Sequence, residues 1–207
     1  MEEILRKLSK ERPVFHSERD FQHALAWKIH EQYPDMNVRL EKRIKLDGKE
    51  IYVDIYLQDK EKNVVIIELK YKTKSLEIVV NGEIFKLKDQ LAQDISRYDF
   101  IKDISRLEEC IDELPNAIGY AIFLTNDPTY WKNLPRKTDT QDKNFRIHAG
   151  RVIQGTLKWK EGTSKGTMKG REEPITLKKS YKLNWRDYSN LGVKNGIFKY
   201  LLVKVWK

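Results

Sequence analysis

The segment that most constrains the fold is 64–71, with the sequence VVIIELKY. Its first four residues are apolar, so both faces of a strand built from them would be buried, as they are in the middle of a sheet. Because side chains alternate along a strand, Glu68 and Lys70 project from the same face as Ile66. A carboxylate and an ammonium beside a buried strand cost free energy unless they pair or bind a ligand. This segment therefore predicts a central strand that ends in a polar site.

The surrounding segments predict an α/β core. Two helices come first, one over 1–14 and one from an N-cap at Ser17 to about Tyr33. Apolar periodicity and turn residues indicate the remaining elements. These are strands over 38–46 and 50–57 joined at Asp47-Gly48, a hairpin over 76–87 with its turn at Asn81-Gly82, a helix over 88–113 with a break near its middle, and a strand over 117–124.

The excess of positive over negative charge lies entirely in the last two fifths of the chain. Residues 1–125 carry 21 Lys+Arg against 24 Asp+Glu, whereas residues 126–207 carry 19 against 7. The latter segment also contains short strand-like runs (FRIHAG, VIQGTLKWK, ITLKKSYKLNW and FKYLLVKVW) and a glycine-rich stretch at 161–170 that predicts a loop. We therefore expect a core over 1–125 and a basic, β-rich extension over 126–207 packed on it. The extension would attract a polyanion such as nucleic acid, or simply keep the protein soluble.

Composition excludes several classes of protein. The single cysteine, Cys110, rules out a disulfide scaffold and a metal cluster held by cysteines alone, so a cytoplasmic protein is expected. No apolar run reaches the ~18 residues of a membrane-spanning helix, and the first residues lack the apolar segment of a signal peptide.

Two further carboxylates are expected close to Glu68 and Lys70. Asp54 lies within the apolar strand YVDIYL, and Glu18 lies on the apolar stripe of its helix together with Phe21. Carboxylates gathered at one edge of a core suit Mg²⁺ or Mn²⁺, which take oxygen ligands and retain waters and substrate phosphate. Such an ion activates water and polarises a phosphodiester, and a nearby lysine can orient the water or help to deprotonate it. These residues therefore indicate metal-assisted phosphodiester hydrolysis.

Asp54, followed fourteen residues later by Glu68-Leu69-Lys70, resembles the motif of the PD-(D/E)XK nuclease superfamily. The resemblance covers about 14–125, and IELKYKT in particular is similar to an uncharacterised microbial branch of that superfamily. It implies the restriction-endonuclease-like fold, with a core in the order α-β-β-β-α-β. Val53 stands where the motif has proline.

The resemblance also implies roles for individual residues. Asp54, Glu68 and Glu18 would be the metal ligands, Lys70 would be the motif lysine, and Gln90 or Gln93 would support the site from the following helix, with Tyr98 nearby. The implied activity is a Mg²⁺- or Mn²⁺-dependent nuclease acting on DNA, in restriction or host defence, with a homodimer left open. We expect its nucleic-acid contacts at Lys158, Lys160, Lys178, Lys179 and Arg186.

Each of these interpretations has an alternative. Glu68 and Lys70 could form a surface pair, Asp54 could face solvent, and Glu18 could serve only the helix dipole. Glu41 is a further carboxylate that we expect to pair with a neighbouring lysine, and His16, His23 and His30 are spaced too far along a helix to share one ion. Trp159 and Trp185 fit either a stacking surface or a core, whereas Trp206 is expected in a core. At the level of function, the alternatives are a non-catalytic nucleic-acid-binding module and a partner for an acidic protein.

Overall fold

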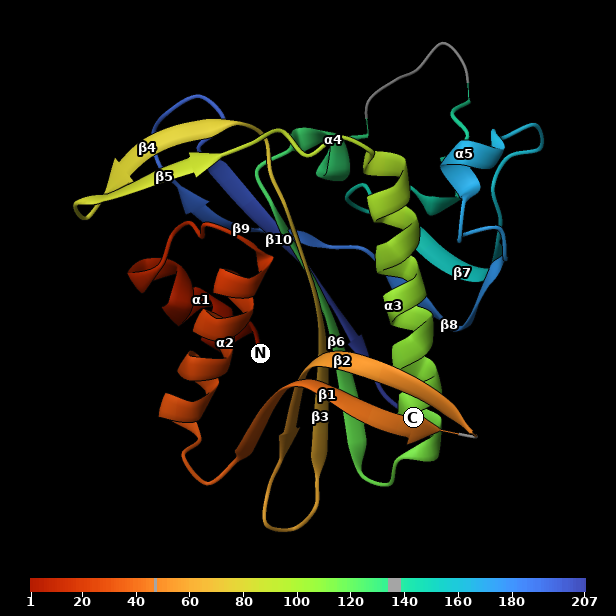
Figure 1. Cartoon of the computed structure of the whole chain (residues 1–207), viewed down its shortest axis with the longest axis horizontal. Coiled ribbons are helices and arrows are strands. Elements are labelled where there is room, and N and C mark those ends of the chain that lie inside the picture. Colours follow the sequence, from red (N-terminus) through yellow and green to blue (C-terminus); the bar gives the residue numbers. More distant parts are fainter. Residues whose placement is uncertain (47, 134–138) are drawn as a thin grey trace.

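The computed structural model describes residues 1–46, 48–133 and 139–207, so the expected turn residue Asp47 lies outside the described residues. The fold is mixed α/β, with one six-stranded sheet, two separate two-stranded sheets and five α-helices within those residues (Figure 1). No helix among them is long and apolar enough to cross a membrane.

Two helices at the start of the chain cover one face of the large sheet. They are α1 (Glu2–Glu11) and α2 (Glu18–Gln32), and the Ser17 hydroxyl caps α2 by accepting a hydrogen bond from Asp20 N, as expected. Their apolar side chains, such as Leu5 and Phe21, belong to one core with Ile67 and Leu69 of the sheet.

The large sheet contains strands from both ends of the chain. Its order is β1-β2-β3-β6-β10-β9, with β3 parallel to β6 and all other neighbours antiparallel. The strands are β1 (Asn37–Leu46), β2 (Lys49–Gln58), β3 (Val64–Lys72), β6 (Ala117–Thr125), β9 (Trp185–Asn190) and β10 (Ile197–Val205). Because β10 pairs with β6, the sheet continues across the boundary expected at residue 125, and the C-terminal residues complete the core as well as packing on it.

The long helix α3 (Gln93–Glu113) connects β3 to β6 and covers the opposite face of the sheet. It is continuous, so the predicted break is wrong, and it begins later than residue 88. Gln90 explains the later start, because its backbone N–H donates to Thr73 O at 2.8 Å and its side chain accepts from Thr73 N. The residue before the helix, Ala92, has φ 67° and ends this extended stretch.

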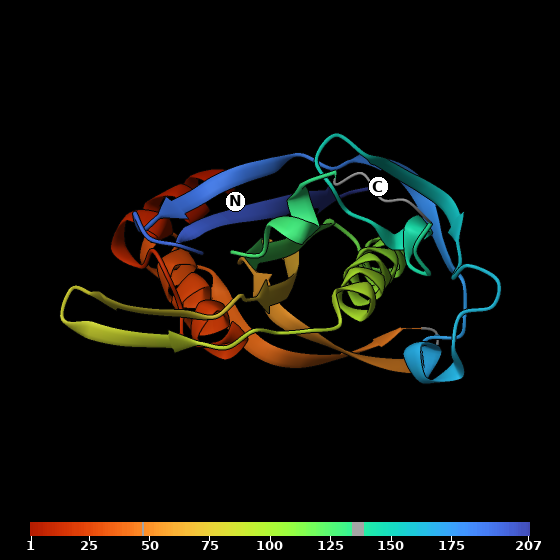
Figure 2. The same ribbon diagram turned by 90° about the horizontal axis from the view of Figure 1, so that it is seen from above.

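The hairpin of β1 and β2 bends at Asp54. Ile55 packs in the core on the α1 and α2 side, whereas Val53 and Ile44, nearer the turn, pack in the core around α3. Seen from above, this half of the hairpin crosses α3 on the side away from β9 and β10 (Figure 2). The α3 helix is therefore covered on two sides.

The remaining elements are short. They are the hairpin of β4 (Leu76–Val80) and β5 (Glu83–Leu87), the hairpin of β7 (Val152–Leu157) and β8 (Ile175–Lys182), the helices α4 (Pro128–Trp131) and α5 (Lys165–Met168), and the 3₁₀ turn η1 (Lys143–Phe145). The first hairpin was predicted from Asn81-Gly82. The run FRIHAG forms no strand, and the expected loop at 161–170 contains α5.

Candidate active site

Asp54 and Glu68 occupy facing positions on β2 and β3. The backbone pairing of these strands ends at Ile55 opposite Ile67, which places the two acidic residues at the next position. There the Asp54 Oδ2 replaces a backbone partner by accepting a hydrogen bond from Leu69 N at 2.6 Å. Directly facing residues of an antiparallel pair share one face of a sheet. The alternation that was expected from the sequence therefore brings both carboxylates to the same side.

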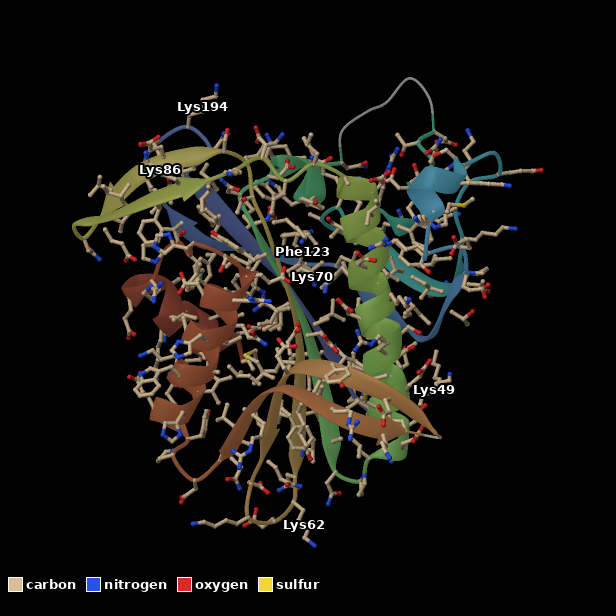
Figure 3. The ribbon with its side chains drawn as sticks, in the orientation of Figure 1. Lys49, Lys62, Lys70, Lys86, Phe123 and Lys194 are labelled. Carbon is tan, nitrogen blue, oxygen red and sulfur yellow. The ribbon has the colours of Figure 1, made fainter. Side chains whose placement is uncertain are left out.

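Lys70 points from that face toward α3. Its Nζ lies 2.5 Å from Asp103 Oδ2, and both side chains are largely buried. Lys70 is in register with Phe123 of β6, and Figure 3 shows these two residues between the sheet and α3. Arg106, one turn further along α3, lies 3.3 Å from Asp103 Oδ1 and 3.3 Å from Glu68 Oε1. Lys70, Asp103, Arg106 and Glu68 thus form a chain of alternating charge.

Burial of Glu68 leaves one of its oxygens without a hydrogen bond. The residue is only 4% exposed, and its Oε1 has no hydrogen-bond partner, because Arg106 approaches without hydrogen-bonding geometry. Burial, followed by the nearby charge of Asp103, raises the pKa of Glu68 well above its usual range. A buried acceptor without a hydrogen bond is costly, and the 3.3 Å contact with Arg106 leaves this oxygen able to accept a further cationic ligand.

The pKa values of Asp54 and Lys70 are both raised in this environment, but for different reasons. Burial raises the pKa of Asp54 to about 6, although the Leu69 N–H and the Lys70 charge act in the opposite direction. Burial alone would lower the pKa of Lys70, but the charge of Asp103 and its hydrogen bond outweigh burial and raise it. Lys70 is therefore a fixed cation at neutral pH.

Glu18 reaches the far end of β3 from the first turn of α2. Its Oε2 accepts a hydrogen bond from Tyr71 N at 2.7 Å and lies 3.7 Å from Lys72 Nζ. Within the described part of the chain, no group of three or more His, Cys, Asp or Glu side chains is close enough to hold a metal ion. The expected meeting of three carboxylates is therefore not formed, because Glu18 binds the Tyr71 backbone and Asp54 binds the Leu69 backbone.

Only Gln93 of the two glutamines lies on the helix that follows β3, and both glutamines form hydrogen bonds away from the buried carboxylates of the candidate site. Gln90 precedes α3, is exposed, and binds Thr73 rather than the buried carboxylates. Gln93 is the first residue of α3, and its side chain donates to Asp127 Oδ2 at 3.1 Å. Glu41 has no lysine partner among the described residues; it accepts from Gln22 Nε2, which also donates to the Asp54 carbonyl. Gln22 therefore supports the bend at Asp54.

Sequence reasoning missed Asp103 and Arg106. A signal was present, because Asp103 falls at helical spacing with the buried residues Phe100, Ile104 and Leu107. An acid on an apolar helix face requires a partner, and Lys70 supplies it.

The side chains expected to contact nucleic acid differ in whether they already form ion pairs or hydrogen bonds within the protein. Lys158 and Lys160 are exposed and form no ion pair with the described residues. Lys178 pairs with Asp112 at 2.5 Å, Lys179 donates to Trp206 O and lies over its ring, and Arg186 pairs with Glu2.

The structure also shows which of the three tryptophans are buried. Trp159 is buried and stacked on Tyr98, and the half-buried Trp185 donates to Ile147 O. The prediction for Trp206 is wrong, because it is 48% exposed beyond the end of β10.

No family model, curated protein or solved structure matches this chain. The candidate site is therefore argued from its own geometry. Mg²⁺ needs only one or two carboxylates when waters and a substrate phosphate supply its other ligands. Asp54 and Glu68 fit that requirement, because they provide two carboxylates on one face and Glu68 Oε1 forms no hydrogen bond.

Proposed function

We propose that this protein is a metal-dependent nuclease that hydrolyses phosphodiester bonds in DNA. The observation that carries the proposal is the buried, unpartnered oxygen of Glu68, on the same face as Asp54 and beside the Lys70–Asp103 pair. A buried carboxylate whose oxygen forms no hydrogen bond is costly to the fold even beside Arg106, and perturbed carboxyls of this kind concentrate at functional sites.

The arrangement of the elements supports the same proposal. A helix, three antiparallel strands, a helix and a strand parallel to the third follow one another in α2, β1, β2, β3, α3 and β6, interrupted by the β4–β5 hairpin. This is the order of the restriction-endonuclease-like core that the sequence resembles. Glu68 and Lys70 lie on β3 and Asp54 lies on its neighbour β2, which supports the resemblance of these residues to the motif.

In this proposal Asp54 and Glu68 hold the metal ion, and Glu18 joins them if it releases Tyr71 N. The ion would lower the pKa of a bound water and polarise the scissile phosphate. Lys70 remains protonated, so it orients the attacking water and stabilises negative charge on the phosphate rather than acting as a base. Asp103 is a positioning residue that fixes the Lys70 ammonium.

Incubation of the purified protein with plasmid and single-stranded DNA, in Mg²⁺, Mn²⁺ or EDTA, tests this function. We expect cleavage with either metal and none in EDTA, and we expect Lys70→Gln to lose it. The exposed Lys86→Gln, which removes a charge from the β4–β5 hairpin, is the matched control and should retain activity. DNA binding without cleavage under every metal condition would instead favour a non-catalytic binding module, and absence of both would favour a protein partner.

The basic segment makes a separate prediction about binding. Because Lys158 and Lys160 have no internal ion pair, Lys158→Gln with Lys160→Gln should lower the slope of log K against log[salt] for duplex DNA by about 1.8, which is ~0.9 for each lost phosphate contact. Lys178→Gln with Lys179→Gln should lower it less, since Lys178 pairs with Asp112 and Lys179 donates to Trp206 O, whereas Lys160 has only a long contact of 3.5 Å with Asp139 O. An unchanged slope in both double variants and in the variant that combines all four substitutions would place the DNA contacts elsewhere.

A further inference from the structure

A small polar hollow is lined by residues of α3, of α4 and of the segment that follows η1. Figure 1 shows α4 close to the N-terminal end of α3. The walls of the hollow include Arg97, Thr129, Tyr130, Lys132, Arg146 and His148. No acidic side chain lines it among the described residues.

Three buried polar atoms in these walls have no hydrogen-bond partner. They are Thr129 Oγ1, the Tyr130 hydroxyl and Arg146 Nε. Tyr130 is only 1% exposed, and burial raises its pKa to about 12, so the hydroxyl stays protonated and can donate. Buried polar atoms in native proteins are nearly always paired with protein, water or a ligand. Three orphaned atoms around one hollow therefore indicate a missing partner that accepts hydrogen bonds.

The charges around the hollow define that partner further. Arg97 is already satisfied, since it pairs with Asp142 at 2.5 Å and donates to Thr129 O at 2.8 Å. Arg146 donates to Thr140 Oγ1 at 2.8 Å, and neither Arg146 nor Lys132 forms an ion pair with a described carboxylate. Burial acts to raise the pKa of the nearby Asp142 carboxyl, and the charge of Arg146 helps to lower it, but the described side chains that line the hollow are themselves neutral or basic, which suits an anion such as phosphate.

The shape of the hollow sets how such a ligand would enter. The space including its open mouth is about 280 Å³, and its inner part admits roughly one water-sized sphere. One oxygen of a phosphate fits the inner part, and its remaining oxygens would lie at the mouth beside Lys132 and His148.

We propose that this hollow binds a phosphate group, with one oxygen inserted between the Tyr130 hydroxyl and Arg146 Nε. The group is supplied either by inorganic phosphate or by the terminal phosphate of a nucleic-acid strand. The hollow contains no residue of the candidate active site, so phosphate binding there can be tested independently of nuclease activity.

The thermal midpoint of the full chain, measured in EDTA with rising inorganic phosphate and with sodium chloride at the same ionic strength, tests the site. Phosphate should raise the midpoint of the wild type and of Arg39→Gln, which removes an exposed arginine from β1. Arg146→Gln and Tyr130→Phe should bind phosphate at least ~10-fold more weakly. Tyr130→Phe should leave the ligand-free midpoint unchanged or higher, because the hydroxyl that it removes has no partner.

Oligonucleotides with and without a 5′-phosphate, titrated in EDTA, distinguish the two sources of the group. Preference for the phosphorylated strand assigns the site to strand ends, and equal binding of both strands with a response to inorganic phosphate assigns it to the free ion. The proposal is overturned if phosphate raises the midpoints of all four proteins equally. It is also overturned if Tyr130→Phe lowers the ligand-free midpoint, or if crystals grown in phosphate show only water in the hollow.

Discussion

Replacing Glu68 with glutamine is expected to reduce DNA cleavage on the order of 10³-fold while leaving the protein at least as stable as the wild type. The loss of activity follows from the role proposed for the carboxylate. A metal ligand stabilises charge in the transition state by several kcal/mol, and ~4 kcal/mol corresponds to a factor of about 10³ in rate. The amide keeps the shape of the side chain but cannot supply the negative charge.

The stability of this variant is expected to rise or stay level because of how Glu68 is held. Burial has already raised its pKa, which means that the folded protein disfavours the ionised form. Its Oε1 has no hydrogen bond to lose. The neutral amide weakens the 3.3 Å contact with Arg106, but it removes a buried negative charge that lies close to the Asp103 carboxylate. Urea unfolding in EDTA measures this difference directly.

Glu108 of α3 provides the matched control, since it is as deeply buried as Glu68 of β3. Its carboxylate accepts hydrogen bonds from Lys178 N at 2.8 Å, Lys179 N at 3.0 Å and the Tyr181 hydroxyl at 2.8 Å. Glu108→Gln would turn an NH₂ group toward a backbone donor, so it should cost about 3 kcal/mol of unfolding free energy. Because Glu108 holds β8 against α3, the loss should not depend on metal.

The two glutamates thus separate a structural role from a functional one. If Glu68→Gln and Glu108→Gln destabilise the protein equally, Glu68 is an ordinary buried acid satisfied by Arg106, and the proposed metal site loses its main support. Full cleavage activity in Glu68→Gln, with normal folding, would show that the reaction uses other residues.

Much of the arrangement around the site follows from local sequence patterns. The run VVIIELKY has apolar residues on both faces, and β3 lies at the centre of the sheet between β2 and β6. The Ser17 cap and the Asn81-Gly82 turn act within a few residues, so their effects are readable from the sequence. The shared face of Glu68 and Lys70 was also predictable from alternation along one strand, whereas that of Asp54 and Glu68 also depends on the register of β2 against β3.

The features that were not predicted depend on contacts between distant segments. The bend at Asp54 relies on Gln22 of α2, whose amide donates to the Asp54 carbonyl. The partner of Lys70 lies on α3, and only the path of that helix across the sheet brings Asp103 within reach. Gln90 was placed on a helix because its segment has helical periodicity, but the backbone C=O of Thr73 accepts from its backbone N–H and the backbone N–H of Thr73 donates to its side chain. In each case tertiary contacts override a local preference.

The stability of the metal-free protein is expected to fall as pH rises through 6, in part because of Asp54. The ordinary pKa of an aspartate is 3.8, and burial raises that of Asp54 to about 6 in the folded protein. The folded protein therefore binds a proton at Asp54 more tightly than the unfolded chain does. A raised carboxyl pKa contributes stability that is fully present below pH 3.8 and is lost as pH rises through 6.

Between pH 4.5 and 7.5 this single group should lower the free energy of unfolding by about 2 kcal/mol. Urea unfolding in EDTA across that range should show a shallower decline for Asp54→Asn, which keeps an acceptor for Leu69 N–H but cannot ionise. The exposed Asp35→Asn is the control and should decline as the wild type does. Equal declines for wild type and Asp54→Asn would mean that the hydrogen bond from Leu69 and the charge of Lys70 fully offset burial. If only the proteins that retain Asp54 show the full decline, the fold holds this carboxylate at a cost in stability. Such a cost is expected of a carboxylate that binds a cation, and it is not expected of one whose role is purely structural.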